Sequence, residues 1–194
     1  LSEEERMISK TAASFANKEL SVRIEKAYNE EIIDEGIFKL MGDTGLLGCT
    51  IPEEFGGLGA NYVSYGLITR EIEKVDSGYR SMMSVQSSLV MYPISKFGSQ
   101  SQKEKYLPKL ASGESVGCFG LTEPNSGSDP ASMTTKAKKV AGGFELNGSK
   151  MWISNAPIAD VFVIWAKSEF HENKIKGFIL EQNFDGLETK KIPG

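Results

Sequence analysis

The sequence predicts an α+β protein, with an all-helical domain over residues 1–114 followed by a β-sheet or barrel-like domain over residues 115–194. Apolar residues recur at three- and four-residue intervals as far as about Leu110, and short apolar runs bounded by Gly and Asn follow. The chain has 194 residues and 40% hydrophobic content, enough to bury the core of one domain or of two small ones. The change of period favours two domains of different class.

Amphipathic helices account for the first part of the chain. Ser2 and Glu5 have the spacing of a capping box that begins a first helix. Its expected buried face consists of Ile8, Ala12, Phe15 and Ala16. Further apolar periodicity predicts helices over residues 30–44 (with Ile33 on the apolar face), 61–75 and 82–94. The Pro- and Gly-rich stretch 51–59 predicts a loop between them.

Another capping signal, formed by Ser99 and Gln102, predicts a last helix that ends before Gly113. Strands are then expected over residues 116–121, 135–140, 144–146, 150–153, 161–166, 176–180 and 187–192. Gly142-Gly143 and Asn147-Gly148 supply turn signals between neighbouring strands. A chain that starts at Leu1 and stops directly after a strand-like segment is expected to be part of a longer one.

Composition excludes several classes of function. The 22 basic and 26 acidic residues give a net charge of -4, which argues against a nucleic-acid partner. No apolar run reaches the roughly 20 residues of a membrane span, and no targeting signal is visible. Cys49 and Cys118 form no CxxC pair, so we expect neither a zinc site nor a disulfide framework, and favour a reduced, intracellular compartment. His171, the single histidine, is expected at the surface, so a His-based catalytic or metal site is disfavoured.

The most informative segment is Gly117 to Asp129, where a β run enters a turn crowded with small and hydroxyl-bearing residues. Gly127 permits close approach of the backbone to a ligand, Thr122 and Ser128 supply hydroxyls, and successive amides can form an anion-binding concavity. An ordinary turn has the same composition. The residues alone therefore leave both readings open.

The order of residues from Gly120 to Asp129 resembles the first signature of the acyl-CoA dehydrogenase family. A second segment, Lys150 to Asn155, resembles the family's strand in which a Trp lies beside the isoalloxazine ring of flavin. Residues 46–59 and 97–108 are similar to the family's N-terminal helical region, so the resemblance covers nearly the whole chain. It implies a helical domain, a β domain and a C-terminal helical bundle that is absent from these residues.

The resemblance implies FAD as the cofactor. Leu121 would lie against the flavin ring, Thr122 would hydrogen-bond to its polar edge, and Ser128 would lie near a phosphate or the substrate. The complete implied cofactor wall is Phe119, Gly120, Leu121, Thr122, Glu123, Pro124, Asn125, Ser126, Gly127, Ser128, Trp152, Ile153 and Ser154. Ser154 stands where many relatives have Thr, and Glu123 is expected to organise the turn rather than to act as a base.

Within the family, residues 71–89 are most similar to the glutaryl-CoA dehydrogenases, and Arg80 is the discriminating residue. A guanidinium can return two charge-assisted hydrogen bonds to the distal carboxylate of a dicarboxylic acyl chain. The resemblance assigns Arg80 and Ser81 to substrate contact, with Ser128, Glu73 and Ser84 as further candidates. The alternative is that Arg80 pairs with Glu73 or Asp76 at a helix end.

The implied reaction removes an α-proton from a thioester and passes the β-hydrogen as hydride to flavin. For glutaryl-CoA, decarboxylation then yields crotonyl-CoA and CO2, a step of lysine and tryptophan degradation. The family draws its base from a later helical domain, so no catalytic residue is expected in this chain. The resemblance further implies a homotetramer, an electron-transfer flavoprotein as acceptor, and the bacterial cytoplasm or mitochondrial matrix as location.

Three alternatives stay open. The first is another enzyme on the same scaffold, namely a short- or branched-chain acyl-CoA dehydrogenase or a flavin monooxygenase relative. The second is a noncatalytic module that binds a CoA ester or flavin, and the third is a scaffold used only for association. A helical domain with a suitably placed Glu, encoded downstream, would favour the enzyme.

Overall fold

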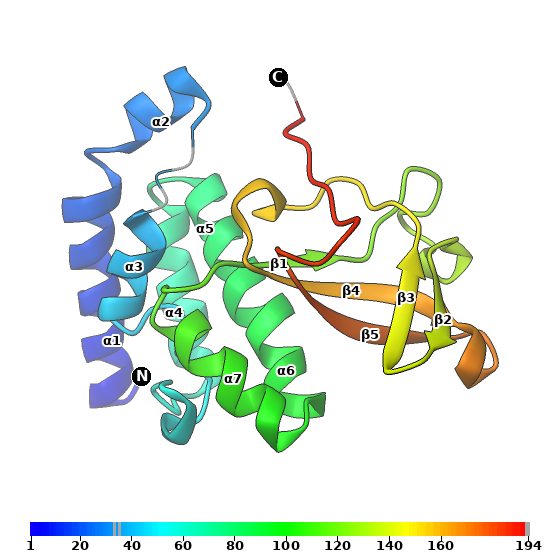
Figure 1. The fold of residues 1–194 in the computed structure, drawn as a ribbon. Helices are drawn as coiled ribbons and strands as arrows, with labels where there is room; N and C mark the ends of the chain where they lie inside the picture. Colours follow the sequence, from blue (N-terminus) through cyan, green and yellow to red (C-terminus); the bar gives the residue numbers. More distant parts are fainter. Residues whose placement is uncertain (33, 35, 193–194) are drawn as a thin grey trace. The chain divides into compact units, whose positions relative to one another are not determined.

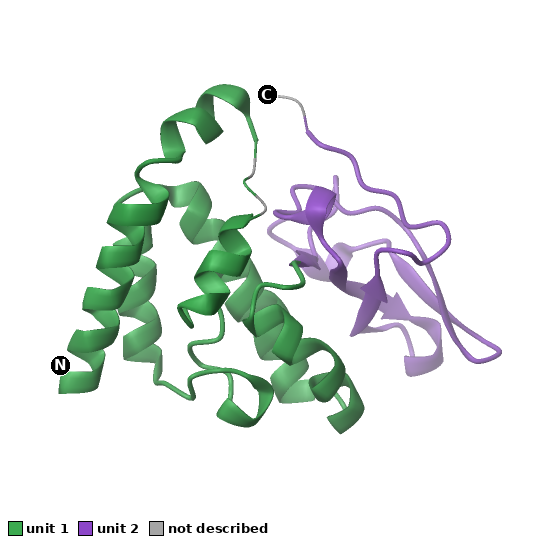
Figure 2. Ribbon diagram, turned by 60° about the vertical axis from the view of Figure 1, so that its left-hand side comes forward, with its two compact units in different colours: residues 1–116 green, residues 117–194 purple. Residues whose placement is uncertain are grey.

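In the computed structural model, which describes residues 1–32, 34 and 36–192, helices fill the first part of the chain and strands the second (Figure 1). The chain divides into unit 1, residues 1–116, and unit 2, residues 117–194 (Figure 2). Within the described residues, no helix has the length and apolar character that a bilayer crossing requires.

The capping signals read from the sequence begin helices in unit 1, as predicted. Ser2 Oγ accepts from the Glu5 amide at 3.1 Å and the Glu5 carboxylate accepts from the Ser2 amide at 2.8 Å, which begins α1 (Glu3–Phe15). Asn61 caps α4 (Tyr62–Glu73), and α1 packs along α4. Ser99 and Gln102 form the box that begins α7 (Gln100–Ala111), and Gly113 follows its end with φ 71°.

The prediction of a helix over residues 30–44 is wrong about where the helix begins. A preceding helix, α2 (Ile24–Glu30), ends there because Glu31 has left-handed backbone angles (φ 50°). The helix α3 (Gly36–Asp43) starts later and buries Ile37 and Met41, while Ile33 lies outside the described residues. The loop expected over residues 51–59 contains one short 3-10 helix, η2 (Glu53–Phe55).

The apolar stretch expected over residues 82–94 forms helix throughout, but not a uniform one. It consists of α5 (Ser77–Ser84), the π-helical η3 (Val85–Met91) and α6 (Tyr92–Phe97); a second π-helical segment, η1 (Ala16–Leu20), extends α1. Asp76 caps α5 by accepting from the Tyr79 amide at 2.9 Å. Gln86 is fully buried in η3 and donates to the carbonyls of Leu110 and Ser115 at 2.9 and 2.8 Å, which ties η3 to the end of α7.

Unit 2 is built around one mixed sheet with a central strand, β4. Its strands are β1 (Gly117–Gly120), β2 (Lys136–Val140), β3 (Gly143–Asn147), β4 (Val161–Ser168) and β5 (Lys174–Glu181). β5 pairs antiparallel with every residue of β4, so β1 and β2, both parallel to β4, share its other edge. β3 extends the sheet as an antiparallel hairpin partner of β2. Short 3-10 turns lie at Pro130–Ser132, Ala156–Ile158 and Glu169–His171.

Two expected strands do not form. Residues 150–153 are not a strand because Trp152 adopts left-handed backbone angles (φ 61°), which interrupt an extended chain. Residues 187–192 have no strand partner; instead Leu187 closes a turn with Phe184 and packs on the buried cluster of Cys118, Ala159 and Phe162. A strand is stabilised by its partner, so an apolar run without one does not become extended sheet.

His171 makes packing contacts that its polar neighbours in the sequence do not predict. It is half-buried, its ring stacks on Phe144 with centroids 6.1 Å apart, and Phe170 meets it edge-on at 5.0 Å. Nδ1 lies 2.8 Å from Ser168 Oγ. The residue therefore belongs to an aromatic cluster at one end of the sheet.

Candidate functional site

The candidate site begins where the edge of β4 is interrupted. β1 pairs with β4 as far as Gly120 opposite Ile164, and the chain returns to the same edge only at Lys136 opposite Lys167. Residues 121–135, here called the edge loop, leave the sheet between these points. Where the loop leaves, Gly120 lets neighbouring side chains approach the backbone, because a Cβ there would lie 2.4 Å from Ile164 Cδ1 and 3.3 Å from Lys150 Cγ. The predicted signature therefore lies at an open sheet edge.

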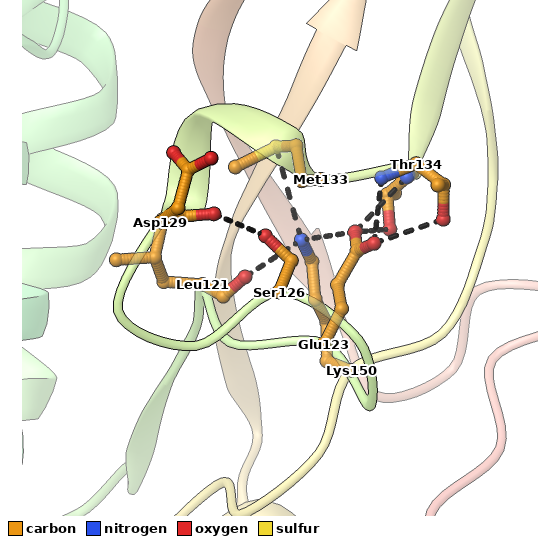
Figure 3. Close-up of polar contacts among 8 residues, drawn as sticks. Leu121, Glu123, Ser126, Asp129, Met133, Thr134 and Lys150 are labelled. Carbon is orange, nitrogen blue, oxygen red and sulfur yellow. Dashed lines mark hydrogen bonds and ion pairs between the residues drawn. The ribbon is translucent and has the colours of Figure 1, made fainter.

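A tight turn closes the front of the edge loop (Figure 3). The backbones of Glu123 and Ser126 exchange hydrogen bonds of 3.0 and 3.1 Å, which leaves Pro124 and Asn125 exposed at the tip. Ser126 is buried, and its Oγ donates to the Asp129 carbonyl at 2.5 Å. Its hydroxyl therefore holds the turn together.

Glu123 is a buried carboxylate with five hydrogen bonds. Oε2 accepts from the amide and hydroxyl of Thr134 at 2.6 and 2.9 Å. Oε1 accepts from the Thr135 amide at 2.9 Å, from the Thr135 hydroxyl and from Lys150 Nζ at 2.9 Å. Burial alone would raise the pKa of this carboxyl, but these donors outweigh it and hold the pKa far below its usual range. Glu123 is thus ionised, and both of its carboxylate oxygens accept hydrogen bonds.

Lys150 and Met151 connect the edge loop to the second signature. Lys150 Nζ donates to the Leu121 carbonyl at 3.0 Å as well as to Glu123, and its side chain is only 9% exposed. The Met151 amide donates to the Thr122 carbonyl at 2.9 Å. Figure 3 shows the Lys150 side chain reaching between Leu121 and Glu123. The two signature segments are therefore held side by side.

Residues 150–155, here called the Trp152 turn, present an aromatic ring outward. Trp152 is 64% exposed, whereas the next residue, Ile153, is half-buried against the Cys118 cluster. Asn155, also left-handed (φ 69°), is buried, and its Nδ2 donates to the Gly117 carbonyl at 3.2 Å. The turn is anchored on both sides of Trp152.

The implied cofactor wall is thereby divided by exposure. The exposed members are Pro124, Asn125, Gly127, Ser128, Trp152 and Ser154. The half-buried members are Phe119, Leu121, Thr122 and Ile153, and the buried members are Gly120, Glu123 and Ser126. A Cβ added at Gly127 would meet nothing within 4 Å, so the backbone there is open to approach. The buried members support the exposed ones.

Of the implied substrate residues, Glu73 lies on α4 of unit 1, Arg80, Ser81 and Ser84 lie on α5, and Ser128 lies in the edge loop of unit 2. Arg80 Nε donates to Glu73 Oε2 at 2.6 Å, and Ser77 Oγ donates to the other oxygen of Glu73 at 2.6 Å. The Ser77 hydroxyl and the Arg80 guanidinium lower the pKa of Glu73. The Arg80 side chain is 36% exposed, and within the described part of the chain it makes no second side-chain hydrogen bond. Ser81 and Ser84 are half-buried on the same helix.

Sequence reasoning missed the residues that join the two signatures, namely Lys150, Thr134 and Thr135. Lys150 lies inside the second signature, but lysine is rarely buried. Its partner Glu123 is 27 positions away, and no local sequence pattern indicates that the two residues pair. Of the described residues, no cluster of His, Cys, Asp or Glu could hold a metal ion.

Comparison with known proteins finds that the chain matches two family models and several relatives. The acyl-CoA dehydrogenase N-terminal domain matches residues 2–114 and the middle domain of the same family matches residues 118–194. A mitochondrial isovaleryl-CoA dehydrogenase of Solanum tuberosum is 37% identical over 95% of this chain and 46% of its own length. An acyl-CoA dehydrogenase of Bacillus subtilis is 38% identical over 98% of this chain and 51% of its own length.

Solved structures give the same match. A glutaryl-CoA dehydrogenase from Mycobacterium smegmatis in complex with FADH2 superposes with a TM-score of 0.95 at 40% identity, covering 100% of this chain and 49% of that one. The chain thus spans about half the length of the relatives it matches. The two family models and the two signatures agree, and the chain belongs to the acyl-CoA dehydrogenase family.

Proposed function

We propose that the protein containing this chain is an FAD-dependent acyl-CoA dehydrogenase in which the edge loop and the Trp152 turn form one wall of the flavin site. The observation that carries the proposal is that the two signatures are joined directly, through Lys150 to Leu121 and Met151 to Thr122. The similar Mycobacterium smegmatis structure contains FADH2, which supports this choice of cofactor.

The residues present suit a flavin. The exposed indole of Trp152 offers a flat apolar surface to a planar ring, and Thr122 supplies a half-buried hydroxyl. Gly127 and Ser128 offer open backbone to a phosphate-bearing group. Bound FAD would supply the hydride acceptor that amino acids lack. The protein residues would hold the ring and exclude water from one of its sides.

For the substrate we propose glutaryl-CoA, with Arg80 as the partner of the distal carboxylate. Among the residues that the structure describes, the guanidinium bonds only through Nε, to Glu73, which leaves its terminal nitrogens for a two-point contact. A solved glutaryl-CoA dehydrogenase in complex with glutaryl-CoA, 35% identical to this chain, supports the choice. The isovaleryl-CoA dehydrogenases, at similar identity, make isovaleryl-CoA the second candidate. Oxidation and decarboxylation of glutaryl-CoA would yield crotonyl-CoA and CO2.

The substrate proposal is tested with Arg80→Ala in the full-length enzyme. We expect kcat/KM for glutaryl-CoA to fall about 100-fold, because a carboxylate is left without its charged partner. For butyryl-CoA and isovaleryl-CoA the change should stay within about twofold, since neither has a distal carboxylate. Arg6→Ala, which removes an exposed arginine from the same unit, is the matched control. Equal losses on all three thioesters would contradict carboxylate recognition.

The catalytic base is proposed to come from outside these 194 residues. Glu123, the acid inside the signature, already accepts five hydrogen bonds and has a strongly lowered pKa, which makes it a poor proton acceptor. We expect the 194-residue chain mixed with FAD and glutaryl-CoA to show no bleaching of flavin absorbance, whereas the full-length protein bleaches. Bleaching by the chain alone would show that the base lies within it.

The proposal also covers partners. By analogy with its family we expect a homotetramer that passes electrons to an electron-transfer flavoprotein, in the bacterial cytoplasm or mitochondrial matrix. Sedimentation of the full-length protein tests the tetramer, and flavin reoxidation by a purified electron-transfer flavoprotein tests the acceptor.

A further inference from the structure

We infer that Lys150 is a positioning residue that fixes the Trp152 ring against the edge loop and thereby sets how tightly, and in what environment, the flavin is held. The inference rests on the proposed function and concerns the same site. Lys150 would act through Trp152 and the loop, without touching the cofactor.

The contacts of Lys150 form a short bridge. Its Nζ bonds to Leu121 and Glu123, and the amide of the next residue, Met151, bonds to Thr122. Three successive residues of the edge loop are thus bound by two successive residues of the Trp152 turn. The side chains of Lys150 and Glu123 are only 9% and 4% exposed, so water competes little for these bonds.

The backbone of Trp152 shows why the bridge is needed. A non-glycine residue with φ 61° is strained, and such strain persists only where the surroundings hold it. Trp152 as a whole is 64% exposed, so packing of its side chain within the described residues does not hold the conformation. The restraints lie on its two sides: the Lys150 bridge before it, and Ile153 and Asn155 after it.

We therefore expect that loss of the bridge frees the Trp152 ring while the sheet stays folded. Asn155 and Ile153 attach the far side of the turn to β1 and the Cys118 cluster, independently of Lys150. Without Lys150, the near side can relax to ordinary backbone angles, which would turn the indole away from the edge loop. Glu123 would keep its four bonds from Thr134 and Thr135.

The experiment uses the full-length protein, stripped of flavin and reloaded with FAD. We compare Lys150→Met, Lys150→Arg and the control Lys136→Met, which removes an exposed lysine of β2. The readouts are the Kd for FAD, the visible circular dichroism of bound flavin and the thermal unfolding of the apoprotein. We expect Lys150→Met to raise the Kd at least tenfold and alter the dichroism, with Lys136→Met unchanged.

Lys150→Arg separates positioning from stability. Arginine keeps the buried charge but cannot place a single nitrogen between Leu121 and Glu123 as the ammonium does. We therefore expect apoprotein stability close to wild type together with an altered flavin dichroism and a raised Kd. Wild-type Kd and dichroism in this variant would overturn the inference, and this result remains informative even if Lys150→Met does not fold.

A last measurement distinguishes failure of this inference from failure of the proposed function. If the wild-type protein binds no FAD, the proposed function fails, and the positioning of Trp152 is judged in the apoprotein. In protein labelled with 5-fluorotryptophan, the 19F signal lost in Trp152→Phe identifies Trp152. Lys150→Arg should shift or broaden that signal and spare Trp165. An unchanged Trp152 signal would show that Lys150 does not position the ring.

Discussion

At the scale of single residues, a substitution at Gly127 should change the affinity for FAD without changing the stability of the fold. A Cβ there meets nothing within 4 Å, so Gly127→Ala should change the free energy of unfolding of the apoprotein by less than about 1 kcal/mol. If the open backbone is where FAD approaches, the added methyl should raise the Kd for FAD by about tenfold or more. Urea unfolding and FAD titration of the full-length protein measure the two effects.

The matched control for Gly127 is Gly143→Ala at the start of β3. Gly143 also has nothing within 4 Å of an added Cβ, but it lies outside the candidate site. We expect neither stability nor FAD affinity to change there by more than about 1 kcal/mol. An unaltered FAD affinity in Gly127→Ala would remove this glycine from the proposed wall.

Glu123 links the site to pH. Because the folded-state pKa is depressed, the stabilisation from the carboxylate is complete above the unfolded pKa of about 4.3 and is lost as pH falls toward the lower folded value. Glu123→Gln should cost about 3 kcal/mol at pH 7, since Lys150 keeps a buried charge without its partner. It should also flatten the loss of stability below about pH 5.

Urea unfolding between pH 3 and 7 checks this dependence. Glu145→Gln removes an exposed carboxylate from β3 of the same unit and should retain the wild-type slope. A Glu123→Gln variant with the wild-type stability and slope would show that the buried network contributes nothing net.

At the scale of elements, the predictions that were confirmed rest on local signals. The Ser2–Glu5 and Ser99–Gln102 boxes bond within one turn of helix, so four consecutive residues contain the information. The expected strand at residues 150–153 failed because its conformation depends on distant partners, above all Lys150 with Glu123. The expected strand at residues 187–192 failed because an apolar run does not specify a pairing partner, and Leu187 packs on the Cys118 cluster instead.

Two glycines of unit 1 give a prediction about helix packing. A Cβ at Gly42 in α3 would lie 2.1 Å from the Ser112 carbonyl oxygen at the end of α7, so Gly42→Ala forces backbone apart and should cost more than about 2 kcal/mol. Gly66 in α4 meets nothing within 4 Å. Gly66→Ala should stabilise by about 0.8 kcal/mol through helix propensity. Urea unfolding of both variants measures the contrast; a destabilised Gly66→Ala or a neutral Gly42→Ala would contradict it.

At the scale of the whole molecule, the motifs located the segments of the candidate site but not its internal support. The resemblance pointed to residues 119–128 and 152–154, which the sheet edge brings together. It did not reveal that Lys150 lies between them, because a buried ion pair is a property of the folded chain. For Arg80 the sequence left two partners open, Glu73 and Asp76, and the structure shows Glu73.

The two cysteines allow the unfolding of each unit to be followed separately. Cys49 in unit 1 and Cys118 in unit 2 are fully buried. Burial raises the pKa of Cys49 to about 11, with a smaller effect of Glu4, and burial raises the pKa of Cys118 to about 12. At pH 8 neither thiol should react with iodoacetamide in the native chain, since each is both protonated and inaccessible.

In increasing urea we expect Cys118 to become reactive at a lower concentration than Cys49. Unit 2 comprises the shorter part of the chain, and its buried large side chains are Met133, Val161, Phe162 and Val163. Unit 1 buries a larger set, which includes Leu20, Phe38, Met41, Ile68, Met83 and Leu107. Apolar burial is the main stabilising contribution, so the unit with less of it should open first. Pulse labelling of the 194-residue chain followed by peptide mass spectrometry separates the two sites, with labelling in full denaturant as the reference. Simultaneous labelling would show that the units unfold as one cooperative body, and earlier labelling of Cys49 would reverse the proposed order of stability.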